Sequence, residues 1–147
     1  MNTRAESTNL LRDVLRQGHR VPVTLNSSSL IPLAYSGETL VVEGCNADQL
    51  RVGELVVFES DEAFVAHRII GKEKRQPHSW FQTAGQEACV PDAWIPDGVI
   101  VGRVIEIRGG SQVTASRSLP GKWRGRLWAW KVRTRCHLHC LRLRFNL

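Results

Sequence analysis

The chain has 147 residues, of which 42% are hydrophobic and 23% charged, which is the composition of one ordinary soluble globular domain. No apolar run approaches the roughly 20 residues that span a bilayer, and the N-terminus lacks the apolar core of a secretory signal. We therefore expect a cytoplasmic protein without a transmembrane anchor. Its cysteines are then expected to be reduced thiols: Cys45, Cys89, Cys136 and Cys140.

The net charge of +6 is concentrated at one end of the chain. Residues 122–147 contain eight Lys or Arg and no Asp or Glu, whereas residues 1–121 contain twelve basic and fourteen acidic residues. The protein is thus a nearly neutral body with a strongly basic tail, and proline and glycine punctuate the chain between the two. The sequence predicts three segments: an N-terminal helix within residues 1–20, a β domain over 21–118 and a basic amphipathic tail over 119–147.

In the body, hydrophobic periodicity predicts one helix followed by strands. Residues 7–18 (STNLLRDVLRQG) place apolar residues at helical spacing before a glycine, which predicts a short amphipathic helix. From Val21 the pattern changes to short β-branched runs between turn residues. Residues 73–79 (EKRQPHS) predict a loop, and we expect the nearby Lys72 and Lys74 to be solvated. The expected strands of this mostly β, twisted domain are 21–25, 39–43, 54–60, 63–70, 79–84 and 99–107.

Three consecutive serines, residues 27–29, follow the first expected strand. Pro32 lies three residues after Ser29, and Gly37 and Glu38 precede the next apolar strand. A proline turn would hold a serine at the end of a strand, and the glycine would allow a tight turn back into the sheet. Serine is a weak nucleophile that needs a base and an oxyanion donor. By itself, this pattern more often marks an ordinary polar turn.

Further motifs change that balance. SLIP (29–32) with GETLVV (37–42) is followed in order by RVGELVVF (51–58), HRII (67–70) and TAGQEACVPDAWIPDGVIVGRV (83–104). These motifs resemble, in the same order, four sequence boxes of the signal peptidase I family, which shares its β-fold with the LexA-like self-cleaving repressors. The resemblance covers about residues 21–107 and implies a twisted fold of that kind, with the short N-terminal helix and a basic C-terminal helix outside it.

The resemblance also implies a serine endopeptidase that works through an acyl-enzyme. Ser29 corresponds to the nucleophile and His67 to the base, as in the archaeal, endoplasmic-reticulum and sporulation-type branch. Histidine changes charge near neutrality, which suits a general base, and Asp92 would orient it. The Ser29 backbone N–H and the Ser27 hydroxyl would form the oxyanion hole. Asp97 is a second candidate acid. The alternatives are a core histidine at position 67 and plain turn residues at Ser27 and Asp97.

This chain departs from the family pattern at several positions. Leu30 replaces the usual methionine, and Glu38 and Glu54 replace aspartates, all of which are mild changes. Gln86 replaces an acid and Ala84 a lysine, so Asp92 would have to act without a neighbouring carboxylate. Because no anchor is expected, the substrate would be a cytoplasmic precursor or leader peptide. It would bind as an added β-strand, with 63–70 as one wall of the cleft.

Two other functions fit the same fold: a peptide-binding module without catalysis and a LexA-like self-cleaving regulator. The histidine base and the absence of a DNA-binding head argue against the regulator. No cofactor or metal is expected. The tail does contain Cys136, His137, His139 and Cys140, but four ligands within five residues of a helix cannot all converge on one ion.

Residues 122–145 return to helical periodicity, with arginines and lysines between the apolar positions. One interpretation is a helix that lies on the inner surface of the membrane. Another is an apolar stripe packed on the β body. Nucleic acid is the least favoured partner, because no DNA-reading motif accompanies the basic residues. The apolar stripe comprises Trp123, Leu127, Trp130, Thr134, Leu138, Leu141 and Phe145.

Overall fold

The computed structural model describes residues 3–31, 33–61, 64–86, 88–109, 112–115, 127, 130, 131 and 134. Its single long helix in the body, α1, spans Thr3–Arg16. Two 3-10 turns, η1 (Ala47–Gln49) and η2 (Asp97–Val99), lie between strands. The strands are β1 (Arg20–Thr24), β2 (Thr39–Glu43), β3 (Leu55–Glu59), β4 (Phe64–Arg75), β5 (His78–Ala84), β6 (Ile95–Pro96), β7 (Ile100–Gly109) and β8 (Gln112–Ala115).

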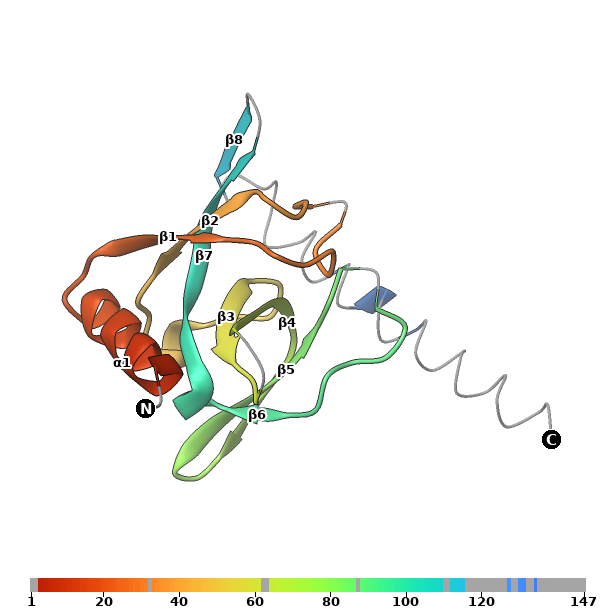
Figure 1. Cartoon of the computed structure of the whole chain (residues 1–147). Helices are drawn as coiled ribbons and strands as arrows, with labels where there is room; N and C mark the ends of the chain where they lie inside the picture. The colour runs from red at the N-terminus through yellow and green to blue at the C-terminus, as the bar shows by residue number, and fades with distance from the viewer. Residues whose placement is uncertain are drawn as a thin grey trace.

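The strands form one antiparallel sheet in the order β1-β2-β7-β3-β4-β5-β6, and β8 pairs with β7. Strand β7 lies far along the chain, yet it pairs between β2 and β3 and so joins the two halves of the sheet. Figure 1 shows the sheet strongly curled, with α1 beside β1 and β7. The prediction of a mostly β domain with one short N-terminal helix is confirmed.

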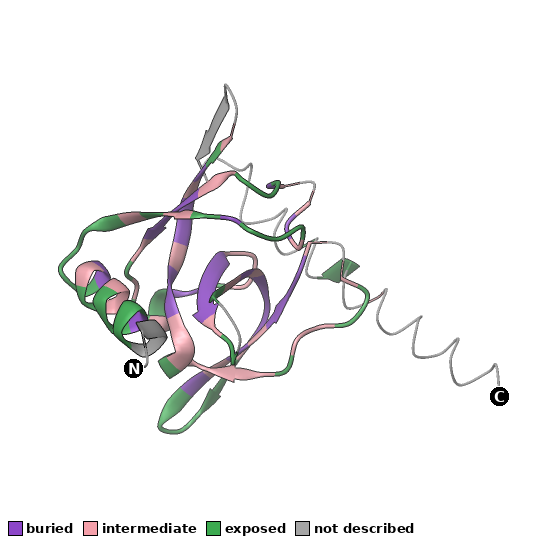
Figure 2. Ribbon diagram, in the orientation of Figure 1, coloured by how far each residue is buried: buried purple, intermediate pink, exposed green. Residues whose placement is uncertain are grey.

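The sheet has a hydrophobic core on each face. In β3, Leu55 and Val57 join one buried cluster, whereas Val56 and Phe58 join the other. This alternation follows from the two-residue period of a strand, and it explains why β3 is buried on both sides in the purple interior of Figure 2. The first cluster also contains Leu30, so the segment that follows the three serines is anchored in the core.

The prediction of a solvated loop at residues 73–79 is wrong. Strands β4 and β5 continue there as a hairpin, with Arg75 opposite His78. The loop signal failed because both faces of this hairpin tip are exposed, so its charged residues show no apolar alternation.

Lys72 also differs from the expectation of a solvated side chain. It lies on β4, and its Nζ donates to the carbonyls of Ala47, Asp48 and Leu50 at 3.1, 3.0 and 3.0 Å. These carbonyls belong to η1 and to Leu50, which follows it. Carbonyls at the C-terminal end of a short helix are available to such a donor, although that of Ala47 also accepts the Leu50 N–H at 3.2 Å. Lys74 is more exposed and pairs with Asp48 at 3.1 Å.

Most of the predicted tail, and the boundary before it, lies outside the described residues. Leu127, Trp130, Lys131 and Thr134 are helical, and the side chains of Leu127 and Trp130 are 61% and 67% exposed. That exposure is not what packing on the β body predicts for these two side chains. In the part of the chain that the structure describes, no helix combines the length and apolar character needed to cross a membrane.

Candidate active site

Ser29 lies on a turn that the core and the sheet both hold in place. Before it, Leu25 extends the pairing of β1 with β2, because its N–H donates to the Glu38 carbonyl at 2.8 Å. Immediately after it, Leu30 is completely buried, and its carbonyl accepts from Leu33 and Ala34 at 2.7 and 3.1 Å. Ser29 itself is partly exposed. The turn therefore presents this serine beside a buried anchor. Pro32, which the sequence motif includes, lies outside the described residues.

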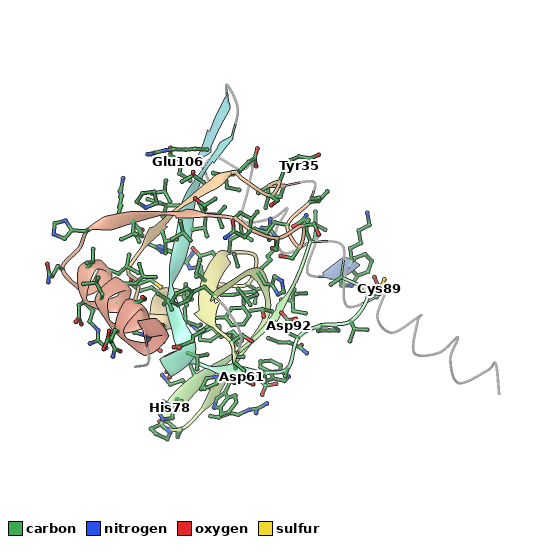
Figure 3. The ribbon with its side chains drawn as sticks, in the orientation of Figure 1. Tyr35, Asp61, His78, Cys89, Asp92 and Glu106 are labelled. Atoms are coloured by element: carbon green, nitrogen blue, oxygen red, sulfur yellow. The ribbon has the colours of Figure 1, made fainter. Side chains whose placement is uncertain are left out.

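His67 and Asp92 are joined directly. His67 Nδ1 lies 2.6 Å from Asp92 Oδ2, and the Asp92 carboxylate also accepts a hydrogen bond from Thr83 Oγ1 at 2.7 Å. His67 lies on β4 and packs edge-on against the Phe58 ring, with ring centroids 6.0 Å apart. Asp92, labelled in Figure 3, lies on the segment that leads from β5 to β6. The predicted base and acid thus meet from two different parts of the chain.

Gly85 connects this pair to Ser29. A Cβ placed on Gly85 would lie 3.5 Å from His67 Nε2 and 3.7 Å from Ser29 Cβ, and 3.1 Å from the Ser29 carbonyl oxygen. The next residue, Gln86, donates its N–H to that same carbonyl at 2.7 Å. The free edge of the imidazole and the serine side chain therefore border the same small space, which the missing side chain of Gly85 leaves open.

The two outer serines are also in contact. Ser27 Oγ and Ser29 Oγ are 3.0 Å apart. Among the residues that the structure describes, this is the hydrogen bond of the Ser29 hydroxyl, which does not reach His67 in this conformation. A serine side chain has three staggered χ1 positions, and proton transfer requires one that turns the hydroxyl toward Nε2.

The electrostatics of the pair fix its proton arrangement. Burial raises the pKa of Asp92, but hydrogen bonds from His67 and Thr83, with the charge interaction with His67, outweigh it and lower the pKa below the usual value. Asp92 is therefore ionised at neutral pH and can only accept. This requires a proton on His67 Nδ1, and in the neutral imidazole it leaves the Nε2 lone pair facing the space beside Ser29.

Gln86, at the position where the resemblance led us to expect an acid, contacts a different side chain. Arg68 is buried on β4 and donates to the Gly53 carbonyl at 2.6 Å and to Gln86 Oε1 at 3.5 Å. Burial lowers the pKa of Arg68 to about 10, which still leaves it charged at neutral pH. The replacement of the acid thus alters the surroundings of Arg68 and leaves the contact between His67 and Asp92 in place.

Asp97, the second candidate acid, does not meet His67. Its carboxylate accepts from the Ser79 N–H and contacts His78 Nδ1, both at 3.0 Å. Asp97 begins η2 just after β6, which pairs with the part of β5 near the hairpin tip. The sequence favoured Asp92 and kept Asp97 as a second candidate, because both aspartates follow the β5 motif within a few residues. Thr83 was not selected, although it is the first residue of the motif at 83–104, because the motif gives no contact between its hydroxyl and Asp92.

Cysteine nucleophiles and metal ions are two other possible sources of chemistry in the described residues. Burial raises the pKa of Cys45 to about 11, so this thiol is protonated at neutral pH and unsuited to attack. Within the described residues no group of His, Cys, Asp and Glu side chains is arranged to hold a metal ion. The Cys and His residues at 136–140 lie outside that part of the chain. A scan of protein-family models and a search of curated proteins found no match to this sequence.

Proposed function

We propose that the chain is a serine endopeptidase with a signal-peptidase-like, LexA-like β-fold, in which Ser29 is the nucleophile, His67 the base and Asp92 the acid that orients it. One observation carries the proposal. His67 holds Asp92 through Nδ1, while its Nε2 edge and the Ser29 side chain border the same space at Gly85. Three residues chosen from separate motifs lie together, and their order is that of a nucleophile, a base and an orienting acid.

The chemistry follows from this order. After the Ser29 hydroxyl rotates, Nε2 takes its proton as Oγ attacks the peptide carbonyl carbon. The Ser29 N–H and the Ser27 hydroxyl would then donate to the oxyanion, and the Ser27 oxygen already lies 3.0 Å from Ser29 Oγ. The imidazolium returns the proton to the leaving amine as the C–N bond breaks. Water, deprotonated by the same imidazole, then releases the acyl group from Ser29.

Strand pairing beside His67 supports binding of an extended peptide. Strand β4 pairs with β3 from Phe64 to Arg68, whereas its pairing with β5 starts only at Arg68. In the described strand pairs, residues 64–67 therefore have no partner on the β5 side. A substrate strand added there would run along β4 toward His67, with main-chain hydrogen bonds providing the affinity. The substrate we propose is a precursor or leader peptide.

The basic tail suggests a second contact. Residues 122–147 carry eight basic and no acidic side chains, and Leu127 and Trp130 are exposed within it. This combination of basic and exposed apolar residues suits the surface of an anionic membrane. We propose peripheral binding there, at the cytoplasmic face, through residues 122–145. Co-sedimentation with vesicles of phosphatidylglycerol, compared with neutral phosphatidylcholine vesicles, tests it: equal binding to both would contradict it.

A peptide-binding module without catalysis is the second candidate. The observation that favours it is the hydrogen bond between Ser29 and Ser27, which leaves the hydroxyl turned away from His67. Such a module would bind a peptide along residues 64–67 and be indifferent to removal of the hydroxyl.

Digestion of a diverse peptide library, followed by mass spectrometry, separates these functions. The wild type is compared with Ser29→Ala and His67→Ala, whose folds are checked by circular dichroism. A peptidase yields cuts that both substitutions abolish. Cuts that persist in Ser29→Ala would contradict the proposed nucleophile. No mutant-sensitive cuts, with peptide binding retained in all three proteins, would identify the binding module. Fragments of the chain itself would identify a self-cleaving regulator.

A further inference from the structure

Thr83 holds Asp92 at two points. Its side chain is completely buried near the end of β5. Its Oγ1 donates to Asp92 Oδ2 at 2.7 Å, and its carbonyl accepts the Asp92 N–H at 2.8 Å. One residue of the sheet therefore fixes both the backbone and the carboxylate of Asp92.

Asp92 needs such a support because its own segment has no regular structure. Residues 88–94 form neither helix nor strand, so no hydrogen-bond ladder of their own sets the position of the carboxylate. Thr83, in contrast, is part of β5, which pairs with β4 along most of its length. A side chain on a rigid strand positions a functional group better than a loop does. The sheet that carries His67 thus also orients Asp92.

The hydroxyl has a specific electronic consequence. Thr83 Oγ1 and His67 Nδ1 both contact the same oxygen, Asp92 Oδ2. A threonine hydroxyl has one proton to donate, and an ionised carboxylate only accepts. Its donation therefore stabilises the ionised carboxylate and spreads its charge. Among the described residues, the titratable group that acts on Asp92 is His67. The neighbouring charge on β4, Arg68, is directed to Gly53 and Gln86 instead.

We propose that Thr83 is a positioning residue: its hydroxyl holds the Asp92 carboxylate in line with His67 Nδ1 and thereby sets the proton affinity of the imidazole. This inference rests on the proposed peptidase function for its effect on rate. It does not rest on that function for its effect on His67, which is measurable without a substrate.

The test compares Thr83→Val, which keeps the shape and removes the hydroxyl, with Thr83→Ser, which keeps the hydroxyl and removes a methyl group. With a peptide found in the library digest, Thr83→Val should lower kcat about tenfold to a hundredfold with KM little changed. Thr83→Ser should stay within about threefold of the wild type. In Thr83→Val the Asp92 N–H still donates to the carbonyl of residue 83, which keeps Asp92 beside His67. Without the hydroxyl the carboxylate charge is less dispersed, so it should attract the imidazolium more strongly.

Histidine-selective ¹⁵N NMR provides the second readout. The charge titration of His67, assigned by its loss in His67→Ala, should move to higher pH in Thr83→Val and stay in place in Thr83→Ser. The signals of His19 and His78 should not move. In an Asp92→Asn background, Thr83→Val should produce no further shift, because its route to His67 has been removed. If Thr83→Val does not fold, Thr83→Ala replaces it in the same comparison with Thr83→Ser.

The outcomes distinguish this inference from the proposed function. If Thr83→Val and Thr83→Ser give the same His67 titration as the wild type, the positioning role is overturned, whatever the activity. If the titration moves as expected but Ser29→Ala leaves cleavage unchanged, the peptidase proposal fails and the role of Thr83 in holding Asp92 stands. If cleavage depends on Ser29 and the two Thr83 variants are equally active with equal titrations, the peptidase stands without this support.

Discussion

Among the residues that the structure describes, two histidine–aspartate pairs are in contact, and only one of them lies beside a serine that the sequence singles out. His67 Nδ1 is 2.6 Å from Asp92, and His78 Nδ1 is 3.0 Å from Asp97. Both contacts use the same imidazole nitrogen and a carboxylate oxygen. Figure 3 shows His78 at the hairpin end of the molecule, away from Asp92. The contact alone is therefore no evidence of a catalytic site.

What differs is the surroundings of each pair. The His67 side chain is only 14% exposed, whereas that of His78 is 59% exposed. The second oxygen of Asp97 accepts a hydrogen bond from the backbone N–H of Ser79. The Ser79 hydroxyl donates to Asp48 Oδ1 instead, at 3.4 Å. Asp92 instead receives a buried hydroxyl, and the other edge of His67 faces Ser29 across Gly85. Burial of the imidazole, a buried side-chain hydroxyl as the second donor and a nearby serine distinguish a candidate triad from a surface ion pair.

The largest expected effect comes from removing each histidine in turn. His67→Ala should lower kcat/KM for a library-derived peptide by at least about a thousandfold, because the serine then lacks its base. His78→Ala should leave it within about twofold, since an exposed pair contributes little even to stability. Steady-state kinetics on both proteins measure this difference. Equal losses in the two variants would remove the functional distinction between the pairs.

A smaller loss of activity is expected from adding a methyl group to the glycine near each pair. A methyl group at Gly85 would lie 3.5 Å from His67 Nε2 and 3.1 Å from the Ser29 carbonyl, a tight contact with the backbone that carries the nucleophile. Gly85→Ala should therefore lower kcat about tenfold to a hundredfold. Gly98→Ala, beside Asp97, is the matched control, because its Cβ would meet no atom within 4 Å. The comparison fails if Gly98→Ala is as slow as Gly85→Ala while both proteins are folded.

The sequence predicted six of the described strands and named the three residues of the proposed site. It did not predict β6, β8, the full length of β4 or what lies around the site. Ser29 and His67 could be found because each stands in a motif with a fixed spacing. Thr83 also stands in a motif, but its role could not be found, because that role depends on a contact with Asp92 across a segment without regular structure. The contact between Asp97 and His78 could not be predicted either. It depends on the β4–β5 hairpin, whose charged residues led us to expect a loop. The spacing of residues along the chain identifies motifs, whereas contacts between distant segments can be identified only once the fold is known.

The pH dependence of activity should arise from the pair of His67 and Asp92 and not from His78 and Asp97. Histidine is the side chain that changes charge between pH 5 and 8, and a general base works only in its neutral form. Activity should therefore rise with pH as His67 loses its proton, and the rise should be unchanged in His78→Ala. Rates measured from pH 5 to 8 on the wild type and this variant check it. A flat profile in the wild type would argue against His67 as the base.

The smallest effect concerns stability in acid, where the two pairs should behave alike. Hydrogen bonds lower the pKa of Asp92 against the opposing effect of its burial, and the Ser79 N–H leads the causes that lower the pKa of Asp97. A carboxylate with a lowered folded pKa contributes stability above its unfolded pKa of about 3.9, and this stability is lost as the pH falls through the folded value.

Asp92→Asn and Asp97→Asn should therefore each be less stable than the wild type at pH 6, and each deficit should shrink toward pH 3 in urea unfolding. Yet only Asp92→Asn should lose activity at pH 7. A stability deficit in Asp92→Asn that does not shrink in acid would mean that its carboxylate is not stabilised in the ionised form. Since stability responds to any well-bonded carboxylate and activity only to the one that faces His67, the two measurements together identify which aspartate belongs to the site.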